Sequence, residues 1–187
     1  ARKERQIQRI EMLGYTDGKK SVDWICDAGG KVLNLLTKCS ERHCVEQLGL
    51  TPEQHRTKIS ETIRYARRKR LTVNVYLEDW SRGVRHSFDY FSAMVQALRE
   101  LRVARIYLAD TLGVFAPADV TRYVGLMAAT WPAVDFEYHG HNDYGLATSN
   151  CLAAIQAGAR GVHTSVNGMG ERAGNTSLAE IVAAIHD

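Results

Sequence analysis

The sequence predicts an α/β fold of parallel strands, and in particular an incomplete (β/α)8 TIM barrel. Short β-rich segments alternate six times with amphipathic helical segments, which implies parallel pairing and right-handed crossovers. The strand predicted over 71–78 has one apolar and one polar face. Polar faces suit a barrel interior, whereas a doubly wound sheet more often has continuously apolar strands. The barrel is therefore favoured over that alternative.

Turn and cap signals define the elements in the first half of the chain. Thr16-Asp17-Gly18 ends a weak strand, and Gly29-Gly30 stops a short helix. Thr51 can cap the longest helix, with Pro52 at its first position and Gln54 completing a capping box. The expected elements are a helix over 1–10, a strand over 11–15, a helix over 21–28, a strand over 31–36, a helix from 51 to about 70 and a strand over 71–78.

The second half continues the same alternation. Ser87 is expected to cap a helix, and another helix stops before Pro132, because a proline disfavours helical backbone in the residue before it. Gly158 ends a third helix. The expected helices cover about 87–102, 117–130, 145–157 and 176–186, and the expected strands cover 105–109, 135–141 and 161–166.

The length suits one domain with a hydrophobic core, but not a complete barrel. The chain has 187 residues, whereas a closed barrel of this kind usually needs about 250. Residues 1–187 are therefore expected to form a single partial TIM-barrel domain of about six β/α units that lacks the first two strands.

The composition excludes several classes of protein. With 45% hydrophobic and 24% charged residues, the chain is not expected to be disordered. It has no apolar run of about 18 residues, so no membrane span is expected, and its charged start is unlike a signal peptide. A cytoplasmic location follows. The net charge of +3 is too small to indicate a nucleic-acid partner.

A pair of histidines is the most informative feature. His139 and His141 stand two positions apart, so on a strand both rings point to the same side, where they can bind one divalent metal ion. The alternative for either ring is a hydrogen-bonded histidine without a ligand. Asn175, after the next strand, can add a side-chain oxygen or cap a helix. Mg²⁺, Mn²⁺ and Zn²⁺ suit this set about equally.

Two further polar residues end neighbouring strands. Glu78 lies on the polar face of its strand, where a carboxylate can act as a base or polarise a bound carbonyl. Its alternative is an ion pair with Arg82. Thr111 could hold a substrate carboxylate through its hydroxyl, or it could cap a helix. Both side chains fall at the end of a barrel where active sites lie.

Three glycines and two inward-facing residues complete the candidates. Gly168, Gly170 and Gly174 allow the backbone to approach a ligand closely, or they form a flexible turn. Glu137 should point inward and would need a partner there. His163 should also point inward, and it is interpreted as a satisfied core histidine rather than a metal ligand.

Five motifs, in this order, resemble those of the aldolase-type barrels that include 2-isopropylmalate synthase, homocitrate synthase, citramalate synthase and 3-hydroxy-3-methylglutaryl-CoA lyase. They are Leu33–Ser40 with His43, Leu77–Trp80, Asp110–Gly113, His139–Gly145 and Asn167–Asn175. The resemblance covers nearly the whole chain.

The resemblance implies a role for each candidate residue. A divalent metal would be held by His139 and His141, with Asn175 close by or ligating. Glu78 would be catalytic and lie near the reacting centre. The other implied roles are substrate binding by Thr111, Tyr76 and Asn34, and contact with acyl-CoA by the loop that contains Gly168, Gly170 and Gly174.

The loop also separates the activities within the family. The lyases carry a cysteine there, and residues 168–175 contain none, so the chain is most similar to the condensing synthases, and to 2-isopropylmalate synthase above all. This implies an acyltransferase of leucine biosynthesis, a homodimer that condenses acetyl-CoA with a 2-oxo acid in a metal-dependent Claisen reaction. The alternatives are a lyase-like C–C cleavage and a non-catalytic domain that binds a metal or a partner.

Two departures from the family pattern matter. The family's first strand carries an Asp metal ligand beside an Arg that binds the 2-oxo acid, and a region after the barrel supplies a catalytic His. Residues 1–187 contain no counterpart of either, so this chain by itself is expected to be inactive.

Overall fold

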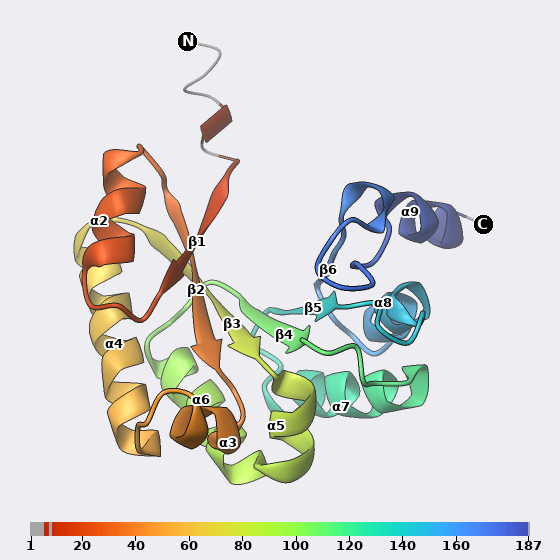
Figure 1. Ribbon diagram of the computed structural model, residues 1–187, viewed down its shortest axis with the longest axis horizontal. Coiled ribbons are helices and arrows are strands. Elements are labelled where there is room, and N and C mark those ends of the chain that lie inside the picture. Colours follow the sequence, from red (N-terminus) through yellow and green to blue (C-terminus); the bar gives the residue numbers. More distant parts are fainter. Residues whose placement is uncertain (1–5, 8, 187) are drawn as a thin grey trace.

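The protein is described by a computed structural model for residues 6–7 and 9–186. The strands of this part of the chain form one parallel sheet in sequential order, β1-β2-β3-β4-β5-β6 (Figure 1). Their bounds are β1 Glu11–Tyr15, β2 Val32–Lys38, β3 Thr72–Glu78, β4 Ile106–Asp110, β5 Phe136–Gly140 and β6 Gly161–His163. The predicted parallel α/β order is confirmed, and the sheet is curved but not closed.

Helices connect each strand to the next, and α9 follows the last strand. Their bounds are α2 Lys20–Asp27, α3 Glu41–Glu46, α4 Pro52–Arg68, α5 Trp80–His86, α6 Phe88–Glu100, α7 Pro117–Thr130, α8 Ala147–Gln156 and α9 Leu178–His186, with a short 3₁₀ turn, η1, at Val166–Gly168. They lie along the outer side of the curved sheet (Figure 1). The helix expected over 1–10 falls largely on residues 1–5 and 8, which lie outside the described residues.

The local signals had different outcomes. At α4 the capping box is present: the Thr51 hydroxyl accepts a hydrogen bond from the Gln54 amide, and the Gln54 side chain accepts one from the Thr51 amide. Ser87 occupies the position before α6 but makes no side-chain cap; its hydroxyl donates instead to the carbonyl of Gly83. Helices α3 and α5 were not predicted, because both are too short to show a helical period.

The last strand is shorter than expected. It ends at His163 rather than at 166 because the chain turns there. The Ser165 amide donates to the carbonyl of Thr176, and Asn167 adopts a left-handed backbone with φ 55°. This turn brings the glycine-rich loop back across the end of β5.

The two faces of the sheet differ as the alternation predicted. Val73, Val75 and Leu77 on the outer face of β3 are buried against the helices, and burial of such side chains is the main stabilising contribution to folding. Asn74 and Tyr76 face the concave side of the same strand, where the Asn74 side chain donates to Asn34 Oδ1 on β2 at 2.9 Å. The concave face of β3 therefore carries polar side chains. Within the described residues, no helix has the length and hydrophobicity that a membrane crossing requires.

Acid should destabilise the fold through His55. Its ring is fully buried, with Nδ1 2.5 Å from the Tyr90 hydroxyl, and burial lowers the pKa of His55 from 6.5 to about 4. Above pH 6.5 the ring is neutral in both states. As the pH falls below that value, the unfolded chain takes up a proton that the folded chain does not, so stability falls until about pH 4.

Urea unfolding at pH 7 and pH 5 measures this effect. We expect His55 to account for a loss of about 2 kcal/mol in the free energy of unfolding between the two. In a His55→Gln variant that part of the pH dependence should disappear. A variant with the same pH dependence as the parent protein would contradict the assignment to His55.

Candidate metal centre and substrate pocket

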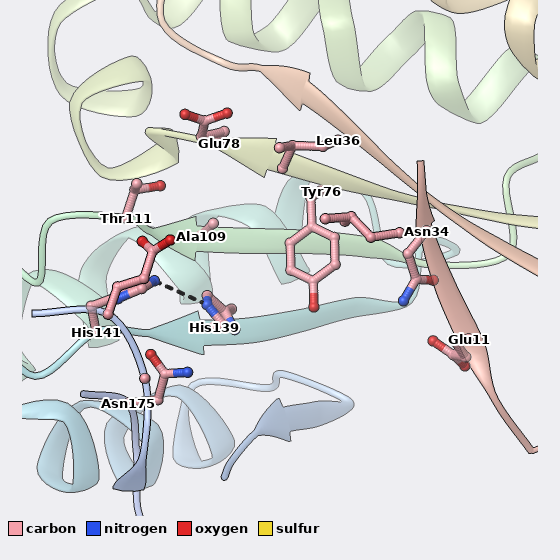
Figure 2. Close-up of a pocket in the computed structure, with 13 residues that line it drawn as sticks. Glu11, Asn34, Leu36, Tyr76, Glu78, Ala109, Thr111, His139, His141 and Asn175 are labelled. Carbon is pink, nitrogen blue, oxygen red and sulfur yellow. Dashed lines mark hydrogen bonds between the residues drawn. The ribbon is translucent and has the colours of Figure 1, made fainter. Parts of the chain in front are cut away.

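A cavity of about 580 Å³ opens on the concave face, toward the carboxyl ends of the strands (Figure 2). It is lined by Glu11, Leu13, Asn34, Leu36, Tyr76, Glu78, Ala109, Thr111, His139, His141, Gly170, Glu171 and Asn175. The structure thus brings together all the predicted site residues except Gly168 and Gly174. The sheet places them there because inward-facing residues of neighbouring strands come into register, as Ala109 does with His139.

The two predicted histidines converge. His139 is the inward-facing residue before the end of β5, His141 follows the strand, and their Nε2 atoms lie 3.2 Å apart. Burial, and then the neighbouring His163 and His141 rings, lower the pKa of His139 to about 3. Burial, and then the Arg172 guanidinium, also lower the pKa of His141. Both imidazoles are therefore neutral at pH 7, which is the form that binds a metal ion.

A divalent cation fits the polar groups that converge here. Asn175 Oδ1 is buried without a hydrogen-bond partner, and a buried acceptor without a partner costs free energy. A cation would satisfy this amide oxygen and would also accept a lone pair from each of the two Nε2 atoms, which lie 3.2 Å apart. Across the described residues, no group of three or more His, Cys, Asp or Glu side chains is placed to hold a metal. The candidate set is therefore two imidazoles and one amide.

The glycine-rich loop holds the Asn175 side chain in place. His141 and Asn175 form an antiparallel bridge, and the backbone amide of Asn175 donates to the carbonyl of Gly168. A Cβ atom on Gly174, whose φ is +93°, would lie 2.2 Å from the carbonyl oxygen of Gly168, and one on Gly170 would lie 2.7 Å from the Asn175 carboxamide carbon. All three glycines thus allow close backbone packing around Asn175. Of the three, only Gly170 lines the cavity.

Arg172 connects the same loop to the residues that follow β4 and β5. Its guanidinium donates to both carboxylate oxygens of Asp143, at 2.6 and 2.7 Å, and to the carbonyl of Thr111 at 2.8 Å. Its contact with Glu171 is longer, at 3.6 Å. Asp143 was not predicted as the partner, although it stands two positions after His141.

Glu78 and Thr111 face the cavity, and both have partners. Lys38 Nζ lies 2.7 Å from each carboxylate oxygen of Glu78, so among the described residues Glu78 pairs with Lys38 and not with Arg82. The Thr111 hydroxyl accepts a hydrogen bond from the Asp79 amide at 2.8 Å. Lys38 was missed because the predicted strand ended at 36, although alternation beyond that point places residue 38 on the inner face.

The fold and the site together define an α/β-barrel type of domain with a histidine pair at the mouth of its cavity. The HMGL-like family model matches residues 2–187, and the chain belongs to this family. Similar proteins include a probable 2-isopropylmalate synthase of Ignicoccus hospitalis, 36% identical over 170 residues, which are 89% of this chain and 41% of the relative. A homocitrate synthase of Sulfurisphaera tokodaii is 33% identical over 94% of this chain and 38% of its own length.

Solved structures agree on the fold. A hydroxymethylglutaryl-CoA lyase from Pseudomonas aeruginosa superposes with a TM-score of 0.79 at 18% identity, over 95% of this chain and 62% of that chain. The HMG-CoA lyase from Brucella melitensis gives a TM-score of 0.78 at 18% identity, over 100% of this chain and 71% of that chain. The predicted partial barrel is thereby confirmed as a fold. The chain spans about two fifths of the length of the curated relatives that it matches.

Proposed function

We propose that this chain is the catalytic barrel of an enzyme that condenses acetyl-CoA with a 2-oxo acid, as a 2-isopropylmalate synthase does in leucine biosynthesis. The observation that carries the proposal is the convergence of His139, His141 and the unpaired Asn175 oxygen on one cavity. Family membership supports an acyl-CoA enzyme. The predicted homodimer and cytoplasmic location belong to the same proposal.

Different residues of the cavity would bind the metal and transfer the proton. His139, His141 and Asn175 would hold a divalent metal such as Mg²⁺, Mn²⁺ or Zn²⁺, which acts as a Lewis acid on a bound ketone. Glu78 faces the same space and assists the removal of a methyl proton from acetyl-CoA. The resulting enolate carbon forms a bond to the ketone carbon of the 2-oxo acid as the ketone π bond breaks, and the alkoxide oxygen that results takes up a proton. Water then hydrolyses the thioester and releases CoA.

The charges of the cavity favour a monocarboxylic substrate. Glu11, Glu78 and Glu171 are the charged residues among the described residues that line it. Lys38 is paired with Glu78, and Arg105 is paired with Glu11 at 2.5 Å. These basic side chains are thus already paired, so a second carboxylate at the far end of a 2-oxo acid would meet no free cation among the described residues that line the cavity, and burying it there is unfavourable. This favours 2-oxoisovalerate over 2-oxoglutarate.

Release of free CoA from acetyl-CoA tests the proposal, with the full-length enzyme that contains this barrel, Mg²⁺ or Mn²⁺, and each 2-oxo acid in turn. We expect turnover with 2-oxoisovalerate and a kcat/KM at least about tenfold lower with 2-oxoglutarate. Cleavage of 3-hydroxy-3-methylglutaryl-CoA without any condensation would point to the lyase alternative. A metal-free oligomer that turns over none of these substrates would support a non-catalytic domain.

A further inference from the structure

One aromatic side chain divides the cavity. Tyr76 projects from β3 between its two ends (Figure 2). His139 and His141 lie at the metal end, and Asn34 and Glu11 lie at the other. A 2-oxo acid held at the metal end would therefore direct its side chain toward the Tyr76 ring.

A column of partly buried polar groups fixes the position of that ring. The Tyr76 hydroxyl lies 2.8 Å from His163 Nδ1, and His163 Nε2 lies 3.0 Å from a carboxylate oxygen of Glu137. Arg105 contacts the other Glu137 oxygen at 3.2 Å. These groups come from β3, β6 and β5 and from the residue directly before β4, so the column links the central strands to the edge strand β6.

The Glu137 carboxylate determines the direction of each hydrogen bond in this column. An ionised carboxylate only accepts hydrogen bonds, so His163 Nε2 carries the hydrogen that Glu137 accepts. In the neutral ring, Nδ1 is then an acceptor, and the Tyr76 hydroxyl donates to it. Burial and the Glu11 and Glu137 carboxylates raise the pKa of Tyr76 to about 12, so the hydroxyl keeps this hydrogen.

Aromatic packing restrains the same ring from the sides. The Tyr107 ring contacts Tyr76 edge-on at a centroid distance of 4.5 Å, and the His139 ring does so at 5.6 Å. Such edge-to-face contacts allow the ring plane few alternatives. The hydroxyl bond to His163 then fixes the remaining freedom, which is the tilt of the ring into the cavity.

We propose that His163, oriented by Glu137, is a positioning residue that fixes Tyr76 as the wall limiting which 2-oxo acid the cavity accepts. The proposal rests on the proposed function. With the wall fixed, the space beside the metal ligands accepts a short aliphatic side chain and excludes a longer one. His163 was interpreted from the sequence only as a satisfied core histidine.

Two variants of His163 separate positioning from simple packing. His163→Leu removes the acceptor for the Tyr76 hydroxyl, whereas His163→Asn keeps a polar acceptor close to the position of Nδ1. The probes are 2-oxoisovalerate and the longer 2-oxohexanoate, whose dissociation constants are measured by calorimetry on the Mn²⁺-loaded protein. The matched control is Tyr107→Phe, which removes a phenol hydroxyl of the same layer that donates to Glu11 and does not line the cavity.

We expect His163→Leu and Tyr76→Phe each to reduce the preference for 2-oxoisovalerate about three- to tenfold. His163→Asn should keep most of the preference, and Tyr107→Phe should leave it unchanged. In the double variant Tyr76→Phe/His163→Leu the loss should equal that of either single variant, because His163 acts through the hydroxyl. Additive losses, or an unchanged preference in His163→Leu, would overturn the proposal while leaving the proposed function standing.

A second measurement does not depend on ligand or turnover. The ¹⁵N shifts of the His163 ring should report a neutral ring with hydrogen on Nε2 in the parent protein, and Tyr76→Phe should shift the Nδ1 resonance. A ring with hydrogen on Nδ1 would overturn the proposed hydrogen-bond order. Failure of both 2-oxo acids to bind, with these shifts as expected, would instead count against the proposed function and the specificity that rests on it.

Discussion

Replacing His141 with alanine is expected to lower the affinity for Mn²⁺ more than about a hundredfold and to abolish acetyl-CoA-dependent turnover. The loss of an outer-shell partner alone typically costs ten- to a hundredfold in metal affinity, and His141 would supply one of only two imidazoles. His139→Ala should behave in the same way, since its Nε2 lies 3.2 Å from that of His141. Calorimetric titration with Mn²⁺ measures the affinity of each variant.

The control for this prediction is a histidine outside the cavity. His86 is exposed at the end of α5, so His86→Ala should retain the metal affinity and activity of the parent protein. Thermal unfolding of all three variants without metal distinguishes loss of a ligand from loss of the fold. Unchanged Mn²⁺ affinity in both His139→Ala and His141→Ala would remove the basis of the proposed function.

The strands were predictable because they are short and bounded by turn residues, and β3 also alternates between apolar and polar residues. Val73, Val75 and Leu77 mark the outer face of β3 without any knowledge of its neighbours. Helix α4 was predictable because its cap residues act locally. Local signals could not predict the end of β6. In the turn that follows His163, the Ser165 amide donates to the carbonyl of Thr176, which stands thirteen positions after His163 in the chain.

The candidate site was also predictable from local sequence only in part. The spacing of His139 and His141 predicts that the two rings lie on one side of a strand, and the structure places them so. The partners of the remaining residues depend on register between strands. Lys38 stands opposite Glu78 only because β2 and β3 pair in that register, and Tyr76 meets His163 across two intervening strands. Such pairs cannot be read from one segment of sequence.

That Lys38 partner affects the second large prediction, which concerns Glu78. Lys38 holds both carboxylate oxygens of Glu78 at 2.7 Å, and each side chain is 20% exposed. The pair keeps the carboxylate at a defined position on the rim of the cavity. Glu78→Gln keeps the shape of the side chain but removes its charge and its ability to take up a proton.

We expect Glu78→Gln to lower kcat about a hundredfold to ten-thousandfold, the usual contribution of a positioned proton-transfer group, with little change in Mn²⁺ affinity. Steady-state kinetics with acetyl-CoA and 2-oxoisovalerate measure this change. The matched control is Glu171→Gln, because Glu171 lines the same cavity but is exposed and lies 3.6 Å from its partner Arg172. Equal losses in the two variants would show that kcat responds to the net charge of the cavity rather than to proton transfer at Glu78. Glu78 would then have no specific catalytic role.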